Sequence, residues 1–171
     1  MQIFKTIRAV HHKAQVRLFS RVLPYYLINE FPKAGGSWLA LMVAEYFDIP
    51  FRRNERLRLE YAVTHGHFFY QFGLHKPVIL WRDPRDIFVS LYYHCFFENE
   101  FENKNVVNSM RKFFEFQDYS DIENNFTQFF VAVQRGRCPF KLSWVKFYEN
   151  WGGHDYCCHV KYEDLLNDCS S

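Results

Sequence analysis

Phe31-Pro-Lys-Ala-Gly-Gly-Ser-Trp38 joins an apolar run at 25–28 to a helical pattern at 39–47. This order predicts a strand, a tight glycine turn and a helix N-terminus, where backbone N–H groups and the helix dipole hold phosphate. Gly35 and Gly36 carry no Cβ, so the backbone there can approach an anion closely. The lysine of this stretch precedes the glycines, whereas in the pattern G-x-x-x-x-G-K-[ST] it follows them. We therefore predict a phosphate-binding loop of a different kind.

A second segment has the same strand-to-helix order. Residues 77–82 are typical of a short buried strand, and Asp83 and Pro84 suit the N-cap and the first position of a helix. Arg82 then lies at the carboxyl end of the strand, where open α/β sheets bind ligands. Ser90 follows about two helical turns into the helix. An arginine fork and a hydroxyl placed in this way could grip a second phosphate.

Three motifs in order give the chain its resemblance to a known family. They are F-P-K-A-G-G-S-W, R-D-P-R-D-I-F-V-S and a late V-K-Y-E-D-L-L, and together they span about 25–166. The pattern resembles the sulfotransferases that use 3′-phosphoadenylyl sulfate (PAPS). The resemblance implies a single α/β domain of the P-loop-like sulfotransferase fold, with a central, mostly parallel sheet flanked by helices. It also implies transfer of a sulfuryl group from PAPS to a hydroxyl or amine, with PAP as product and no metal.

The resemblance also implies roles for particular residues. Lys33 would contact the bridge between phosphate and sulfate, and the Ser37 hydroxyl would help the loop N–H groups to cradle the 5′-phosphate. Arg82 and Ser90 would hold the 3′-phosphate. The full set of implied cofactor-binding residues is Lys33, Ala34, Gly35, Gly36, Ser37, Trp38, Arg82, Ser90 and Tyr162.

Each of these positions also has a purely structural interpretation. Trp38 would stack on adenine by resemblance, but it also suits a core position on the first helical turn. Tyr162 would touch the nucleotide or simply end a strand in an aromatic core. Arg82 could instead form a surface ion pair with Asp86, and Ser90 could be an ordinary helix serine.

The reaction needs a base to take the proton of the acceptor, and imidazole titrates in the right range. His65, in the run A-V-T-H at 62–65, occupies the place of the family's histidine, so His65 and Lys33 are the predicted catalytic residues. Val63 stands where the family has lysine, and His67 is the second choice as base. The two histidines could also chelate a metal, but the sequence offers no evident third ligand.

Composition agrees with one folded α/β domain. The chain has 171 residues, of which 49% are hydrophobic and 20% aromatic, a composition that argues against intrinsic disorder. A net charge of +2 does not argue for a nucleic-acid partner, and five cysteines without C-x-x-C do not suggest a disulfide framework. No apolar stretch is long enough to cross a membrane, and we expect a cytoplasmic protein. Strands are expected at 25–31, 61–66, 77–82 and 156–161, and helices at 37–47, 84–97, 105–117, 122–134 and 139–150.

Residues 1–24 are predicted to form a basic amphipathic helix, and 25–171 the sulfotransferase-like domain. The helix has no acidic residue, and its apolar residues recur at helical spacing. They are Ile3, Ile7, Val10, Ala14, Leu18 and Val22. We expect this helix to pack on the domain, and the alternatives are a transit peptide or contact with a membrane surface.

The end of the chain departs from the family pattern. Relatives continue past Y-E-D-L into a basic R-K-G segment that closes over the 3′-phosphate, whereas here no lysine or arginine follows Lys161. Losing one charge-assisted phosphate contact costs on the order of 1.5–3 kcal/mol. The alternative to an active enzyme is therefore a truncated, weak or inactive homologue that binds PAP, PAPS or a protein partner. A P-loop nucleotide kinase is a more distant alternative. The acceptor, a small molecule or carbohydrate, is not encoded in any motif.

Overall fold

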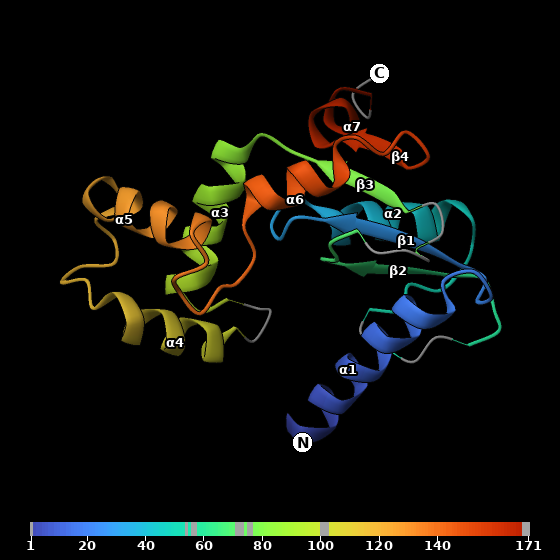
Figure 1. Cartoon of the computed structure of the whole chain (residues 1–171), viewed down its shortest axis with the longest axis horizontal. Helices are drawn as coiled ribbons and strands as arrows, with labels where there is room; N and C mark the ends of the chain where they lie inside the picture. Colours follow the sequence, from blue (N-terminus) through green and yellow to red (C-terminus); the bar gives the residue numbers. More distant parts are fainter. Residues whose placement is uncertain are drawn as a thin grey trace. The chain divides into compact units, whose positions relative to one another are not determined.

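A computed structural model describes residues 2–53, 55, 58–70, 74, 77–99 and 103–168. The chain divides into two compact units, one formed by 1–82 with 151–171 and the other by 83–150. The sheet and the predicted phosphate loop belong to the first unit, which is shown with the rest of the chain in Figure 1.

The first unit is built on four parallel strands: β1 (Tyr25–Glu30), β2 (Ala62–Gly66), β3 (Val78–Trp81) and β4 (Cys158–Lys161). Their order across the sheet is β2-β1-β3-β4, so β1 lies between β2 and β3. The chain leaves β1 toward one side for β2 and reaches β3 on the other side. In open α/β sheets such a reversal opens a crevice at the carboxyl ends of the strands, and ligands bind there.

The helix α2 (Gly36–Tyr46) covers one face of the sheet, because its apolar residues match those that the strands present on that face. This core is made by Ile28, Leu39, Ala40, Ala44, Val63 and Leu80. Val63 is fully buried in it. A lysine at this position would have to bury its ammonium group among apolar side chains, which is costly. The packing of the sheet against α2 thus accounts for an apolar residue at position 63.

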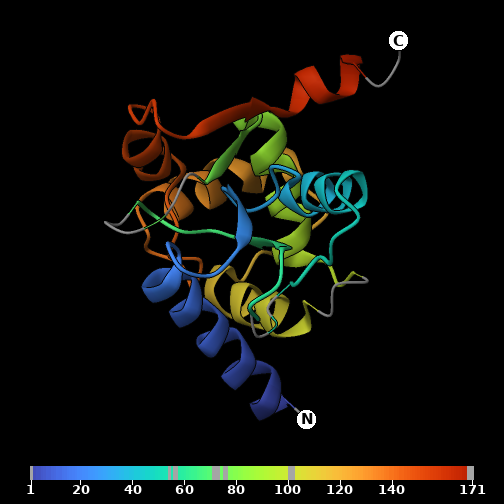
Figure 2. The same cartoon turned by 90° about the vertical axis from the view of Figure 1, so that its right-hand side faces the viewer.

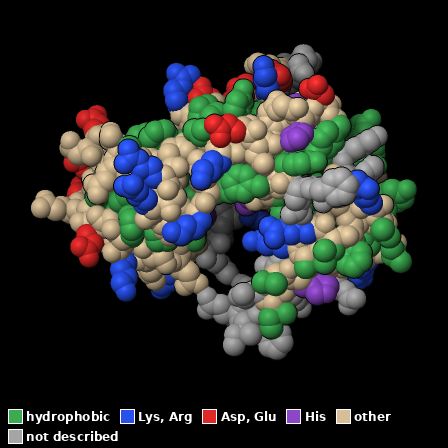
Figure 3. Space-filling view, viewed as in Figure 1, with side chains coloured by type: hydrophobic (Ala, Val, Ile, Leu, Met, Phe, Trp, Pro, Cys, Tyr) green, Lys and Arg blue, Asp and Glu red, His purple; other side chains and the backbone are tan. Residues whose placement is uncertain are grey.

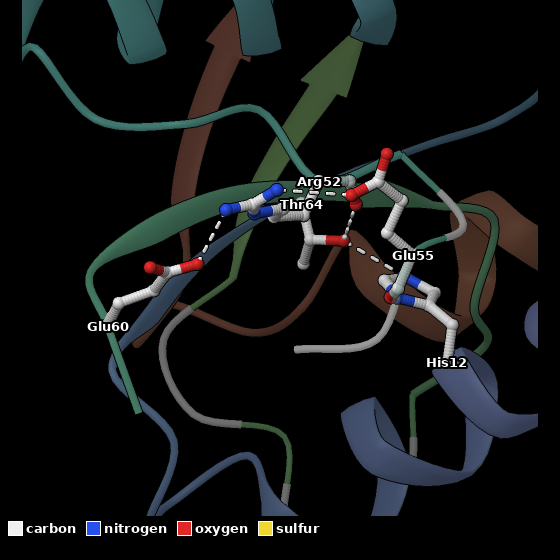
Figure 4. Close-up of polar contacts among 5 residues, drawn as sticks. All are labelled: His12, Arg52, Glu55, Glu60 and Thr64. Atoms are coloured by element: carbon white, nitrogen blue, oxygen red, sulfur yellow. Dashed lines mark hydrogen bonds and ion pairs between the residues drawn. The ribbon is translucent and has the colours of Figure 1, made fainter. Parts of the chain in front are cut away.

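The N-terminal helix α1 (Gln2–Phe19) is held to the β2 side of the sheet by polar contacts. His12 Nε2 lies 3.0 Å from Thr64 Oγ1, and His12 Nδ1 donates to the Glu55 carbonyl at 2.7 Å, as Figure 4 shows. The Tyr25 hydroxyl donates to Val16 O at 3.0 Å. In Figures 1 and 2, α1 lies toward β2, while the helix α7 (Tyr162–Asp168) follows β4 at the other edge.

The buried face of α1 is not its apolar stripe. His12 and Val16 are buried, whereas Ile7 and Val10 are 58% and 63% exposed. The space-filling view shows hydrophobic side chains at the surface over this helix (Figure 3). The predicted helix is present and contacts the sheet, as expected, but through a face other than its apolar stripe. Hydrogen bonds of His12, which a hydropathy pattern does not contain, decide the orientation.

The second unit is helical and has an aromatic core. It comprises α3 (Pro84–Phe96), α4 (Lys104–Phe114), α5 (Ile122–Gln134) and α6 (Trp144–Trp151), whose last residue belongs to the first unit. The Tyr92 and Phe96 rings pack in it at a tilt, with centroids 4.7 Å apart, and the Phe96 ring lies edge-on to Phe129 with centroids 5.6 Å apart. The predicted N-cap is confirmed, because the Asp83 carboxylate accepts from Arg85 N at 2.8 Å.

The predicted α/β class is confirmed by the four-stranded parallel sheet with its flanking helices. Two details differ from the predictions. The helix expected at 139–150 begins only at Trp144, and Tyr162, expected at a strand end, opens the unpredicted helix α7. Among the described helices, none combines the length and apolarity required to span a membrane.

Candidate functional site at the carboxyl edge of the sheet

The turn after β1 has the tight geometry that the sequence predicts. Lys33 and Gly35 both have positive φ, 76° and 105°, and α2 begins at Gly36. A Cβ on Gly35 would lie 2.9 Å from the Tyr162 ring, so glycine is required by both conformation and space. A lysine in this conformation costs about 1–2 kcal/mol, and such strained residues cluster at ligand sites.

Arg82 meets this turn at the carboxyl ends of β1 and β3. Its Nη1 makes a long hydrogen bond of 3.4 Å to Lys33 O, and its guanidinium lies 4.4 Å from the centre of the Tyr162 ring. The Trp38 ring packs edge-on to Tyr162 with centroids 5.5 Å apart. The sequence analysis singled out Lys33, Trp38, Arg82 and Tyr162, and these residues lie together near the carboxyl ends of β1 and β3. We call Arg82, Tyr162 and Trp38 the β3 side of the edge.

The opposite side of the same turn contains a residue that sequence reasoning missed. Glu30, the last residue of β1, is only 4% exposed, and its carboxylate accepts hydrogen bonds from Gly36 N and, at 3.0 Å, from His65 Nε2. A Cβ on Gly36 would come within 2.6 Å of the Glu30 carboxyl carbon. A larger residue than glycine at this position would therefore clash with the Glu30 side chain. We call Glu30, His65 and His67 the β2 side of the edge.

Several loop donors already have acceptors within the protein. Ala34 N donates to Phe31 O at 3.1 Å, and Trp38 N donates to Gly35 O at 3.0 Å. The Gly36 N–H donates to the buried carboxylate described above. Three of the five backbone donors that the resemblance assigns to the 5′-phosphate are therefore engaged here. An anion at this turn would have to displace some of these bonds or use other groups.

His65 is positioned by the sheet. It pairs with Ile28 in the β1–β2 register, and its ring is buried, at 7% exposed, against Glu30. Since a carboxylate only accepts, Nε2 of His65 donates the hydrogen bond to Glu30. This is the arrangement of a histidine base oriented by a carboxylate.

His67 follows directly, with its ring centroid 4.9 Å from that of His65. Its Nδ1 donates to Glu30 O at 3.1 Å. His67 is exposed to solvent on one side, yet the protein atoms around it partly desolvate the ring and, together with the neighbouring His65, lower its pKa below the ordinary value. His67 is therefore mostly neutral at pH 7, with a lone pair on Nε2.

These three residues could also hold a metal ion. One ligand atom each from Glu30, His65 and His67 lies within 4.8 Å of the other two, so the structure supplies a third group that the sequence did not reveal. Two imidazoles and a carboxylate form a ligand set that suits zinc. The same atoms are engaged in the hydrogen bonds described above.

The two predicted serines lie in different units. Ser37 is half-buried in the first turn of α2, close in sequence to Lys33. Ser90 is half-buried in α3, within the second unit. Its assignment to the 3′-phosphate stays a prediction.

No protein-family model matches the chain, and no curated protein matches it. Among solved structures, the fold is similar to that of mouse sulfotransferase SULT7A1 complexed with PAP, with a TM-score of 0.62 and 16% sequence identity. The match covers 96% of this chain and 61% of the mouse chain. The chain thus has a sulfotransferase-like fold and spans about three fifths of the mouse protein's length.

Proposed function

We propose that this chain binds PAPS at the carboxyl ends of β1 and β3 and transfers its sulfuryl group to an acceptor hydroxyl or amine. The observation that supports this most is the meeting of Arg82, the Lys33 turn and Tyr162 where the strand order reverses. Anionic ligands bind at such crevices in open α/β sheets. The residues present fit a bisphosphorylated nucleotide, since the Arg82 guanidinium, the backbone of the Lys33 turn and two aromatic rings meet there.

The proposed chemistry is in-line transfer. The acceptor oxygen forms a bond to sulfur while the bond from sulfur to the phosphate oxygen breaks, and PAP leaves. Lys33 stabilises the charge that develops on the departing phosphate. His65 Nδ1 takes the acceptor proton, and Glu30 holds Nε2–H and so orients the ring. Arg82 and Tyr162 position the nucleotide.

A second candidate function is binding without catalysis: the chain would bind PAP, PAPS or a protein partner and transfer little or no sulfate. The contact between Glu30 and Gly36 N favours it, because a carboxylate at the start of α2 occupies a donor that would otherwise serve a phosphate. A buried negative charge at this place also repels an incoming phosphate.

Two measurements separate these functions. Calorimetry with PAP tests nucleotide binding, and labelled PAPS with a panel of hydroxyl acceptors tests transfer. The active enzyme predicts both binding and transfer, with transfer lost in Lys33→Ala and His65→Gln and kept in Lys146→Ala, an exposed lysine of α6. Binding without transfer across the panel identifies the second candidate. A wild-type chain that shows no PAP binding contradicts both nucleotide-binding functions.

A further inference from the structure

A cavity of about 340 Å³ opens beside the candidate base. It lies within the first unit and is lined by α1, by the end of β2 and by the segment that follows β2. His65 and His67 border it on the sheet side. Its volume falls in the range of pockets that hold small molecules, which is about 300–1,000 Å³.

Positive charge dominates the lining of the cavity. Lys13 and Arg17 lie one helical turn apart on α1 and therefore share a face, and Arg53 reaches the cavity from the segment after α2. None of the described residues that line it is acidic. Three cations around one concave site raise the local concentration of anions.

The walls of the cavity are fixed by buried hydrogen bonds. On the α1 side, His12 bonds to Thr64 and to the Glu55 carbonyl, and desolvation by burial lowers its pKa, so it is a neutral polar wall at pH 7. On the sheet side, the Asn29 side chain accepts from Phe68 N at 2.7 Å and donates to Phe68 O at 3.0 Å. The cavity is thus framed by anchored elements, which favours a preformed site.

We propose that this cavity is the acceptor site and that it selects a small acceptor with an anionic group, such as a carboxylate or a phosphate ester, beside its hydroxyl. The anionic group lies among Lys13, Arg17 and Arg53, and the hydroxyl reaches His65. Phe68, which is 4% exposed, contributes an apolar wall. The inference rests on the proposed transfer reaction, with the same proton passing to His65, and it adds the chemical class of the acceptor.

The solvent exposure of the three cationic side chains limits how strongly they can favour an anionic acceptor. Lys13, Arg17 and Arg53 are exposed residues, so salt screens their attraction for an anion. We expect the preference for an anionic acceptor to weaken as ionic strength rises. We expect PAP affinity to be unchanged when the α1 charges are removed, because the proposed nucleotide site uses Lys33 and Arg82.

Matched probe pairs test the inference. 4-Hydroxybenzoate and 4-hydroxybenzamide differ in charge on one ring, and glucose 6-phosphate and glucose differ by a phosphate ester. Histidine ring signals in NMR report binding to the chain without nucleotide, and labelled PAPS reports transfer. We expect the anionic member of at least one pair to bind about tenfold more tightly, with shifts of the His65 and His67 signals.

The charge variants complete the test. Lys13→Gln combined with Arg17→Gln should abolish the preference, while the matched pair Lys112→Gln with Arg135→Gln in the second unit should keep it. Equal binding of charged and neutral members in both pairs, or a preference that the α1 variant leaves intact, overturns the inference. Absence of PAP binding with a preserved anion preference instead contradicts the proposed function and leaves the cavity as an anion site.

Discussion

The two sides of the turn after β1 differ in charge, although both lie at the carboxyl ends of the parallel strands. On the β3 side, Arg82 and Tyr162 present a cation and a ring to the turn. On the β2 side, the Glu30 carboxylate is buried between Gly36 N and His65. The β3 side is thus suited to receive an external anion, whereas the β2 side already contains an internal one. The difference teaches that a phosphate-loop sequence defines a backbone shape, while the neighbouring side chains decide which part of it accepts phosphate.

The largest expected effect is on the β3 side. Arg82→Ala should weaken PAP binding by about 1.5–3 kcal/mol, or roughly 10- to 100-fold, because a charge-assisted contact is lost. Calorimetry measures it, with Arg85→Ala as control, since the Arg85 side chain is 89% exposed and pairs with Asp83. Equal losses in the two variants would mean that Arg82 has no special place in the nucleotide site.

On the β2 side, the close fit between Gly36 and Glu30 should appear in stability. Gly36→Thr should lower the free energy of unfolding by about 1–3 kcal/mol through overpacking against Glu30. The double variant with Glu30→Ala should recover part of this loss. Urea unfolding measures both, and Gly153→Ala is the control, because nothing lies within 4 Å of a Cβ built there. Additive losses in the double variant would show that the two positions do not interact.

Removing the internal negative charge sharpens the comparison further. Glu30→Gln keeps the size of the side chain, and it should raise PAP affinity by roughly 1 kcal/mol, or about fivefold, by relieving repulsion. The same variant should slow transfer, because His65 loses the carboxylate that orients it. Unchanged PAP affinity and an unchanged rate of sulfuryl transfer in Glu30→Gln would show that Glu30 affects neither step.

The smallest effect concerns pH and the anchoring of α1. Burial lowers the pKa of His12 in the folded state, so the unfolded chain binds more protons once the pH falls below about 6.5. The resulting stability is fully present above that pH and is lost as the pH falls through the folded pKa.

Urea unfolding at pH 7.5 and at pH 5.5 measures this dependence, and His12→Gln should reduce it. The chain has seven other histidines, so the difference between wild type and variant is the relevant quantity. An identical pH dependence in both chains would contradict the assignment to His12.

Local signals in the sequence were sufficient to predict much of the fold and the residues of the β3 side. The strand, turn and helix around Gly35, the cap at Asp83 and the place of Arg82 all follow from short-range chemistry. Glu30 escaped notice because its contact with His65 depends on the register of β1 with β2, which pairs Ile28 with His65. A polar pair, Asn29 and Glu30, at the end of an apolar strand was the available signal.

The orientation of α1 could not be read from periodicity for a similar reason. The apolar stripe, with Leu18 74% exposed, faces away from the sheet, because His12 and Val16 make the contacts with it. A hydropathy pattern ranks His12 as polar and therefore assigns it to the solvent side. The helix α7 was missed because Tyr162 was assigned to the end of the preceding strand.

A crystal structure of this chain with PAP tests the central claim most directly. The account predicts that one phosphate of the nucleotide lies at the turn by Lys33 and the other against the Arg82 guanidinium, with both at the carboxyl ends of β1 and β3. A nucleotide bound away from this edge, or with neither phosphate in contact with the turn or with Arg82, would contradict it.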